Sequence, residues 1–284
     1  MNADIISSTQ NARIKRLLLL QQKSSERRRS GLFVVEGQRE LNHCMEAGLD
    51  IEEVFVCPQL ISTLSLPDGN GIQPIKGKGQ KWEVTEVAPN VYERIAYRGS
   101  TEGVVAVVRQ HPLKLSDLSP LTPQPTPQKP DASPLIVVLE SVEKPGNIGA
   151  VLRSADAAGA TAVIVCAPRT DLYNPNLIRA SLGAFFTVPM VACTSEECIR
   201  FLKDNGIAIL TAQLQDSHLY YDTDMRRPVA IVMGTEADGL TTVWREAADA
   251  HIRIPMLGRL DSLNVSVSAA ILLFEAVRQR QHQQ

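Results

Sequence analysis

Polar residues that could take part in chemistry gather around two turns in the last third of the chain. Two short, largely apolar runs, 230–233 and 252–256, each break into a turn. Gly234 follows the first run, and Ser262 and Asn264 follow the second. Short apolar runs flanked by Gly or Pro are typical of buried parallel strands, and ligands of such sheets bind beyond the carboxyl ends of the strands. The two turns therefore predict one ligand site.

Each of these residues also has an ordinary structural interpretation. Gly234 could be a turn glycine, and Ser262 and Asn264 could cap the helix expected through 269–277. Glu236, two positions after Gly234, adds a carboxylate to the same turn. The convergence of these residues favours the functional interpretation.

A second polar group follows the apolar run 135–139. Asn147 is a plausible helix cap, whereas Arg153 stands in a helix otherwise made of Ala, Gly, Val and Leu, which favours a functional role. Gly146 and Gly149 superficially resemble a dinucleotide loop, but the full Gly-x-Gly-x-x-Gly pattern is absent. A nucleotide-dependent oxidoreductase is therefore excluded.

The elements that must position these residues alternate regularly after residue 134. Strands alternating with helices indicate βαβ crossovers and a mostly parallel sheet. We expect strands at 135–139, 162–165, near 188, at 207–210, 229–233 and 251–254, with helices at 147–158, near 176–181 and through 269–277.

The first 110 residues predict a smaller α/β unit with a basic start. Its expected strands are 32–35, 54–56, 82–84 and 103–108, with helices after Asn11, through 41–45 and at 91–95. Arg27, Arg28 and Arg29 belong to a basic cluster that could bind RNA phosphates despite the net charge of −2. The alternative is a solvated helix face.

Seven prolines between 112 and 134 predict an extended spacer, because proline disfavours helix and sheet alike. We therefore expect a first domain at 1–110, a Pro-rich linker at 111–134 and a second domain at 135–284. Five cysteines without Cys-x-x-Cys spacing indicate reduced thiols, and no apolar run near the N-terminus is long enough for a signal or a membrane span. The protein is predicted to be cytoplasmic and not to associate with a membrane.

The polar residues belong to three ordered motifs, which are Asn147-x-Gly149-Ala150-x-x-Arg153, Gly234-x-Glu236-x-x-Gly239-Leu240, and Ile254-Pro255-Met256 with Ser262-Leu263-Asn264-Val265-Ser266-Val267. These motifs resemble those of the SpoU/TrmH family of RNA ribose 2′-O-methyltransferases, within the SPOUT superfamily. The segment 179–185 resembles the family's stretch between the first two motifs, and the N-terminal domain more weakly resembles its substrate-binding domain.

The resemblance implies an α/β fold whose C-terminal parallel-sheet domain contains a trefoil knot, preceded by the small α/β RNA-binding domain. It also implies bound S-adenosylmethionine, an RNA partner and a homodimer. The cofactor-binding positions would be Gly234, Ile254, Met256 and Leu263. The catalytic positions would be Asn147, Arg153, Glu236, Ser262 and Asn264.

The expected reaction transfers a methyl group to a ribose 2′-hydroxyl of RNA. Large-subunit rRNA is the favoured substrate, tRNA is the alternative, and no metal is needed. Arg153 cannot be the base, because a guanidinium has no acceptor and a pKa of about 12.5 or more. We expect it to orient a phosphate and stabilise the developing alkoxide, while Asn147 and Asn264 hold the ribose. The alternative function is a non-catalytic, ribosome-associated RNA-binding protein.

Overall fold

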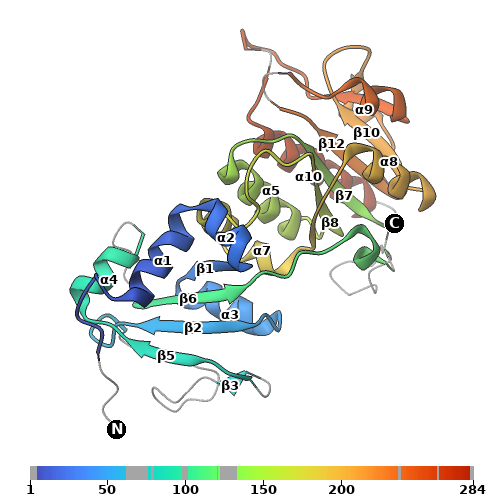
Figure 1. The fold of residues 1–284 in the computed structure, drawn as a ribbon. Coiled ribbons are helices and arrows are strands. Elements are labelled where there is room, and N and C mark those ends of the chain that lie inside the picture. Colours follow the sequence, from blue (N-terminus) through green and yellow to red (C-terminus); the bar gives the residue numbers. More distant parts are fainter. Residues whose placement is uncertain are drawn as a thin grey trace. The chain divides into compact units, whose positions relative to one another are not determined.

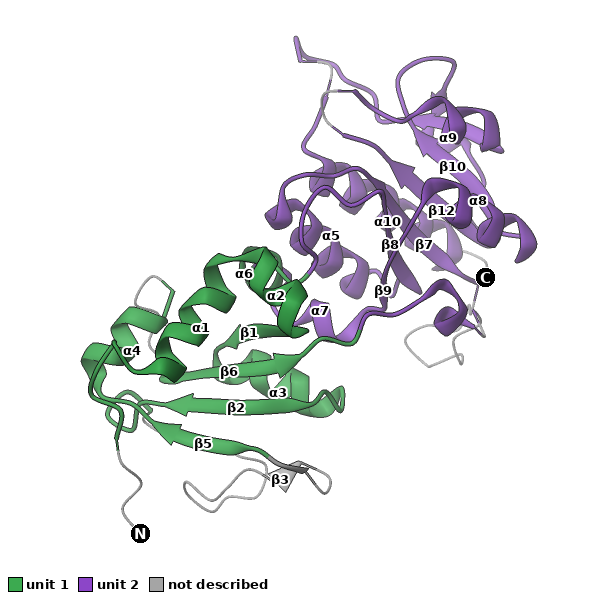
Figure 2. Ribbon diagram, in the orientation of Figure 1, with its two compact units in different colours: residues 1–111, 173–179 green, residues 112–172, 180–284 purple. Residues whose placement is uncertain are grey.

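A computed structural model of the chain describes residues 5–61, 76–77, 80–97, 102–119, 121, 133–235, 238–260 and 262–281. It divides into two compact units, shown in Figure 2. Unit 1 holds residues 1–111 together with 173–179, and unit 2 holds residues 112–172 and 180–284. The return of 173–179 to unit 1 is not predicted by the sequence.

Unit 1 is built on a four-stranded mixed sheet with the order β1-β6-β2-β5. The pair β2–β5 is parallel, and the other two pairs are antiparallel. A separate antiparallel pair joins β3 to β4. The elements are α1 (Ala12–Gln22), α2 (Ser24–Ser30), β1 (Leu32–Glu36), α3 (Gln38–Glu46), β2 (Ile51–Val56), β3 (Lys76–Gly77), β4 (Gln80–Lys81), β5 (Glu83–Glu86), α4 (Pro89–Ile95) and β6 (Val104–Arg109).

The core of unit 1 forms because α1 presents one apolar side to the sheet. Ile14, Leu17 and Leu20 are buried against β-strand residues that include Phe55. Asn11 begins the helix as its cap, accepting a 2.9 Å hydrogen bond from the backbone N–H of Arg13. The expected N-terminal strands and helices are therefore confirmed in type and position.

Unit 2 is built on a seven-stranded sheet in which every pair is parallel, in the order β11-β13-β10-β12-β7-β8-β9. Its helices and strands, labelled in Figure 1 where there is room, are η1 (Leu115–Leu118), β7 (Leu135–Glu140), α5 (Pro145–Ala157), β8 (Ala162–Cys166), α6 (Pro175–Ser181), α7 (Ala184–Thr187), β9 (Met190–Cys193), α8 (Ser195–Asp204), β10 (Ala208–Ala212), β11 (His218–Leu219), η2 (Tyr220–Asp222), β12 (Val229–Met233), α9 (Thr242–Ala247), β13 (Ala250–Arg253) and α10 (Val265–Gln281). Of these, α6 lies mostly within 173–179, in unit 1.

Both faces of the unit 2 sheet are covered, which explains its continuous apolar strands. Alternate strand residues such as Val138 and Ile164 share a buried core with Trp244 of α9 and Leu202 of α8. The intervening residues, such as Val137, are equally buried and point to the opposite face, where α5 and α10 pack together against the strands. The predicted parallel α/β domain is confirmed, and the trefoil knot stays a prediction.

Part of the predicted proline-rich spacer is ordered structure of unit 2. Leu113 forms an isolated parallel bridge with Val191, and Leu118 and Leu121 are buried in the core of unit 2. Leucines between the prolines drive this packing, since burial of each apolar side chain is favourable. The described chain also holds no helix with the length and hydropathy needed to cross a membrane.

Candidate active site

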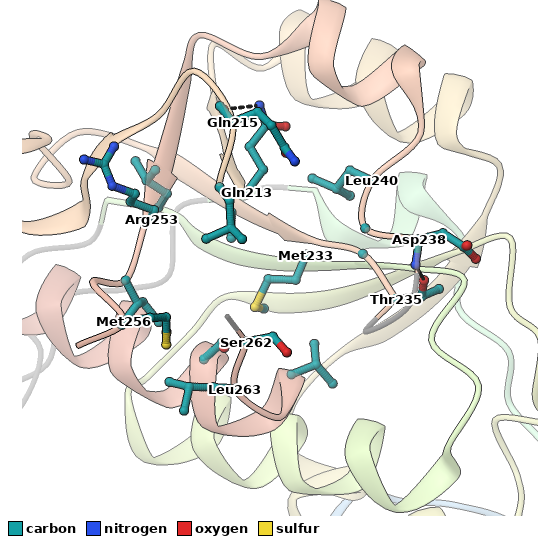
Figure 3. Close-up of a pocket in the computed structure, with 18 of the residues that line it drawn as sticks. Gln213, Gln215, Met233, Thr235, Asp238, Leu240, Arg253, Met256, Ser262 and Leu263 are labelled. Carbon is teal, nitrogen blue, oxygen red and sulfur yellow. Dashed lines mark hydrogen bonds between the residues drawn. The ribbon is translucent and has the colours of Figure 1, made fainter. Parts of the chain in front are cut away.

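A pocket of about 310 Å³ opens at the carboxyl ends of β10, β12 and β13 (Figure 3). In Figure 3, Met233, at the end of β12, points toward Ser262 across this space. Parallel strands bring their carboxyl ends to one edge, so three turns distant in sequence meet here. The lining comprises residues 212–215, 233–235, 238–240, 252–254, Arg245, Met256, Ser262, Leu263, Val265 and Ser268.

The predicted cofactor-binding positions meet in this pocket. Gly234, Ile254, Met256 and Leu263 all line it, as does Ser262. Their assignment to the cofactor remains a prediction that this placement supports. Glu236, predicted as catalytic, lies outside the described residues.

Gly234 is required by the backbone of its own turn. The N–H of Thr235 donates to the carbonyl of Gly239 at 3.2 Å, and the N–H of Gly239 donates back at 3.1 Å. A Cβ on Gly234 would lie 2.0 Å from the Gly239 oxygen, a contact that backbone cannot relieve cheaply. Gly234 therefore has a structural role in its own turn, because the backbone at Gly239 approaches it closely.

The far end of the same turn is tied to β7 by a buried carboxylate. Glu140, 3% exposed, accepts from the Thr241 N–H at 2.9 Å and from the hydroxyls of Thr241 and Ser195 at 2.8 and 2.9 Å. The indole N–H of Trp244 donates to Ser195 at 3.1 Å, which completes the network. The two bonds from Thr241 thus fix the loop that follows Gly234 against β7, and the other two join α8 and α9 to the same network.

The first and third motifs meet through two amide side chains. The Nδ2 of Asn264 donates to the Oδ1 of Asn147 at 3.2 Å. The Oδ1 of Asn264 accepts from the backbone N–H of Ser266 at 3.0 Å, so Asn264 caps α10 as the sequence predicts. Asn147 is no cap, because α5 begins at Pro145 and Asn147 lies inside its first turn.

The structure does not bring Arg153 to the pocket. Arg153 is exposed on α5, six residues beyond Asn147, and is absent from the pocket lining. Six residues turn a helix by about 600°, so the two side chains leave α5 about 120° apart. Arg153 makes no hydrogen bond or ion pair within the described chain, which leaves its guanidinium free for a ligand.

The prediction that Arg27 contacts RNA needs correction. Arg27 is 2% exposed, and its guanidinium donates to the carbonyls of Leu20 and Gln21 at 2.6 and 3.1 Å. It therefore joins α2 to the end of α1 and cannot reach a phosphate. Arg28 and Arg29 are exposed, Arg29 pairing with Glu26, and for these two RNA contact stays a prediction.

Polar residues after β10 also line the pocket and escaped the sequence analysis. Gln213 donates through Nε2 to the Gln215 carbonyl at 2.9 Å, while its Oε1 is buried and has no partner among the described residues. These polar residues follow an apolar strand and lie at the same sheet edge as the two recognised turns. That position in the sequence could have identified them as pocket residues. A buried acceptor without a partner costs free energy unless a ligand donates to it.

Together, a parallel sheet, a pocket at its carboxyl edge and an amide pair beside it define a ligand-binding α/β domain. Residues 134–274 match the model of the SpoU rRNA Methylase family, and residues 11–106 match that of the MRM3-like substrate binding domain.

Similar proteins and solved structures also point to an RNA methyltransferase, and they cover most of the chain. The 23S rRNA (guanosine-2′-O-)-methyltransferase RlmB of Vibrio parahaemolyticus is 38% identical over 187 residues, which is 65% of this chain and 73% of that protein. A crystal structure of an RNA 2′-O ribose methyltransferase is 36% identical, with a TM-score of 0.78 over 97% of this chain and 99% of that chain. The SpoU methyltransferase AviRb of Streptomyces viridochromogenes, in complex with AdoMet, is 27% identical, with a TM-score of 0.80 over 95% and 99% of the two chains.

The chain belongs to the SpoU rRNA methylase family. The family predicted from the three motifs is confirmed, and with it an S-adenosylmethionine-dependent rRNA 2′-O-ribose methyltransferase.

Proposed function

We propose that this protein methylates the ribose 2′-hydroxyl of a guanosine in 23S rRNA. The resemblance to RlmB supports the substrate. Within the chain, the observation that carries the proposal is the Asn264–Asn147 hydrogen bond, because both neighbours of Asn264, Leu263 and Val265, line the pocket. The amide pair therefore stands where a ribose would meet the cofactor.

The pocket fits S-adenosylmethionine in size and polarity. A volume of about 310 Å³ lies at the lower end of the range usual for small-molecule pockets, about 300–1,000 Å³. The buried Oε1 of Gln213 needs a donor, and an adenosine offers amino and hydroxyl groups. Gly234, Ile254, Met256 and Leu263 would hold the cofactor, which supplies an electrophilic methyl group when bound.

The chain's own residues would orient the ribose and stabilise charge. Asn147 and Asn264 carry amide donors and acceptors suited to hydroxyl groups. Arg153, which is exposed, unpaired in the described chain and outside the pocket of its own chain, would act at the site of a second copy of this chain in the homodimer. There it would bind an RNA phosphate and stabilise the ribose oxygen as its proton leaves for water or that phosphate. Glu236 would fix the loops or Arg153, and Ser262 would supply a hydroxyl at the pocket.

A homodimer is part of the proposal. Val267 and Phe274 lie seven residues apart on α10 and are 46% and 48% exposed, and Leu263, which is 37% exposed, lies just before the helix begins at Val265. An apolar stripe of this kind is typical of a surface that a partner covers. A second copy of this chain on α10 would complete the site, since Leu263 also lines the pocket. Val267→Glu should then yield monomers in light scattering and lose methylation, whereas dimeric Val267→Glu would contradict it.

Unit 1 would capture the RNA, and the protein would work in the cytoplasm. The match of residues 11–106 to a substrate binding domain and the exposed Arg28 and Arg29 support RNA capture. A truncated chain that starts after the spacer is a poor test, because unit 1 includes 173–179 and the truncation would remove Leu118 from the core of unit 2. Variants of the full chain test it better.

Mapping of 2′-O-methyl groups in 23S rRNA, in cells with and without this protein, tests the function. We expect one guanosine to lose its methyl group and to regain it when the purified full chain and S-adenosylmethionine are added. Unchanged methylation, together with rRNA binding that transfers no methyl group, would instead support the non-catalytic alternative.

A further inference from the structure

Three thiols converge in unit 2, away from the pocket. The Sγ atoms of Cys166, Cys193 and Cys198 all lie within 4.8 Å of one another. Cys166 and Cys193 end the paired strands β8 and β9 as register partners, with their sulfurs 3.9 Å apart, and Cys198 comes from the first turns of α8. Cys166 and Cys198 are buried, and Cys193 is partly exposed.

Hydrophobic packing alone explains a single buried cysteine better than a group of three. Cysteine often serves as a small apolar side chain in a core. Cys57 does so in the core of unit 1, and Cys44 is buried on α3. Within the described residues, neither joins a cluster of three or more metal-ligating side chains, so these two provide internal controls.

The sulfur separations match those of ligands around one ion. Zinc–sulfur bonds of about 2.3 Å in tetrahedral geometry place two sulfurs about 3.8 Å apart. The Cys166–Cys193 distance is 3.9 Å, and all three sulfurs lie within 4.8 Å of one another. Thiolates select soft ions over magnesium or calcium. Cys193 is partly exposed, so water would be the fourth ligand.

The start of α8 favours negative charge on these sulfurs. Thr194 caps the helix between Cys193 and Cys198, and helix N-termini stabilise thiolates. A bound cation would displace the thiol protons into water, because the thiolate is the metal ligand.

We propose that the thiolates of Cys166, Cys193 and Cys198 bind a d10 cation, and that this cation is Zn(II). The ion would join β8, β9 and α8 at the carboxyl edge of the sheet. None of the three residues lines the pocket, so the role is structural.

The site also connects to the approach to α5. The Cys166 carbonyl accepts from the Ser141 N–H at 2.9 Å, and the Cys193 carbonyl accepts from the Ala167 N–H at 3.1 Å. Ser141 and Ala167 hold left-handed backbone, with φ of 55° and 45°, which is strained for residues other than glycine. Holding β8 and β9 together would stabilise the turn that leads to Asn147.

Titration of the reduced full chain with Cd(II) as a probe tests the site. We expect one equivalent to bind with sulfur-to-metal charge-transfer absorption, and Zn(II) to compete for it and raise the melting temperature. Cys198→Ala should weaken binding by about tenfold or more, since a metal site depends on each ligand. Cys44→Ala, the matched control, should keep the parent's affinity.

A labelling experiment on the parent chain covers the case in which Cys198→Ala fails to fold. Zn(II) should slow the reaction of maleimide with Cys193, the partly exposed thiol, as read by peptide mass spectrometry, and leave the slow labelling of the buried Cys44 and Cys57 unchanged. Absence of charge-transfer absorption, or equal loss of binding in Cys44→Ala, would overturn the proposal. So would a reduced chain that binds no metal but forms a Cys166–Cys193 disulfide with hydrogen peroxide.

Discussion

Asn264 donates its amide hydrogen to the side-chain carbonyl of Asn147 across 3.2 Å, although 117 residues separate the two in sequence. The same Asn264 accepts through its Oδ1 from the Ser266 backbone, so one side chain both starts α10 and contacts α5. The third motif is thereby held to the first beside the pocket.

Substitution of Asn264 separates its two roles. Asn264→Ser keeps a cap acceptor but is too short to reach Asn147, so we expect near-parental thermal stability with methylation reduced about tenfold or more. Asn264→Ala should in addition lose about 0.5–2 kcal/mol of unfolding free energy through the lost cap. Thermal unfolding and initial rates measure both. Full activity in Asn264→Ser would show that the amide bridge is irrelevant to the reaction.

Gly234→Ala should destabilise the pocket loop and weaken S-adenosylmethionine binding together. The added Cβ would stand 2.0 Å from the Gly239 oxygen, so the loop must move. Gly258→Ala is the matched control, because a Cβ there meets nothing within 4 Å. Calorimetry and thermal unfolding check both variants. Normal affinity in a stable Gly234→Ala chain would remove this turn from the cofactor site.

Glu140→Gln should lower stability, since the replacement places an amide group where the carboxylate accepts from Thr241 and Ser195. Each hydrogen bond to a charged group contributes about 1.5–3 kcal/mol, so a loss in that range is expected. Glu143→Gln, which removes only an exposed ion pair with Arg169, should change stability by less than about 1 kcal/mol. Denaturant unfolding compares them, and equal effects would contradict the role of Glu140.

The exposed and the buried arginines of α2 should have different effects when substituted. Arg28→Ala/Arg29→Ala should lower the salt dependence of RNA binding, the slope falling by about 0.7–0.9 for each lost phosphate contact. Arg27→Ala should instead destabilise the protein, because its guanidinium satisfies the carbonyls of Leu20 and Gln21. Filter binding across a salt series, with thermal unfolding, distinguishes them. An unchanged slope in the double variant would mean that these side chains only solvate α2.

Much of unit 2 could be predicted because its strands are buried on both faces and therefore stand out as apolar runs. The pocket residues around Gly234 and Leu263 could be located for the same reason, since strand ends mark the ligand edge. Glu140 could not, because an acidic residue after an apolar run usually faces solvent, and its partners are 55 and 101 residues away. Arg27 was misassigned because the seven residues of α2 are too few for a clear buried face.

The thiol cluster shows the same limit. Cys166 and Cys193 meet only through the pairing of β8 with β9, which no spacing rule for metal sites would find. Conversely, the motifs located Arg153 correctly on a helix, and the structure adds that it stands exposed outside the pocket.

Transfer of labelled methyl groups from S-adenosylmethionine to 23S rRNA, by the full chain and by Arg153→Ala, tests the central claim most directly. Arg153 is assigned to the RNA and the developing alkoxide, so Arg153→Ala should lose transfer while its cofactor affinity, measured by calorimetry, stays within a few-fold. Arg200→Ala, an exposed arginine of α8, should behave as the parent. The predicted result is that the parent chain methylates a ribose and Arg153→Ala does not. Undiminished methyl transfer by Arg153→Ala would contradict the account.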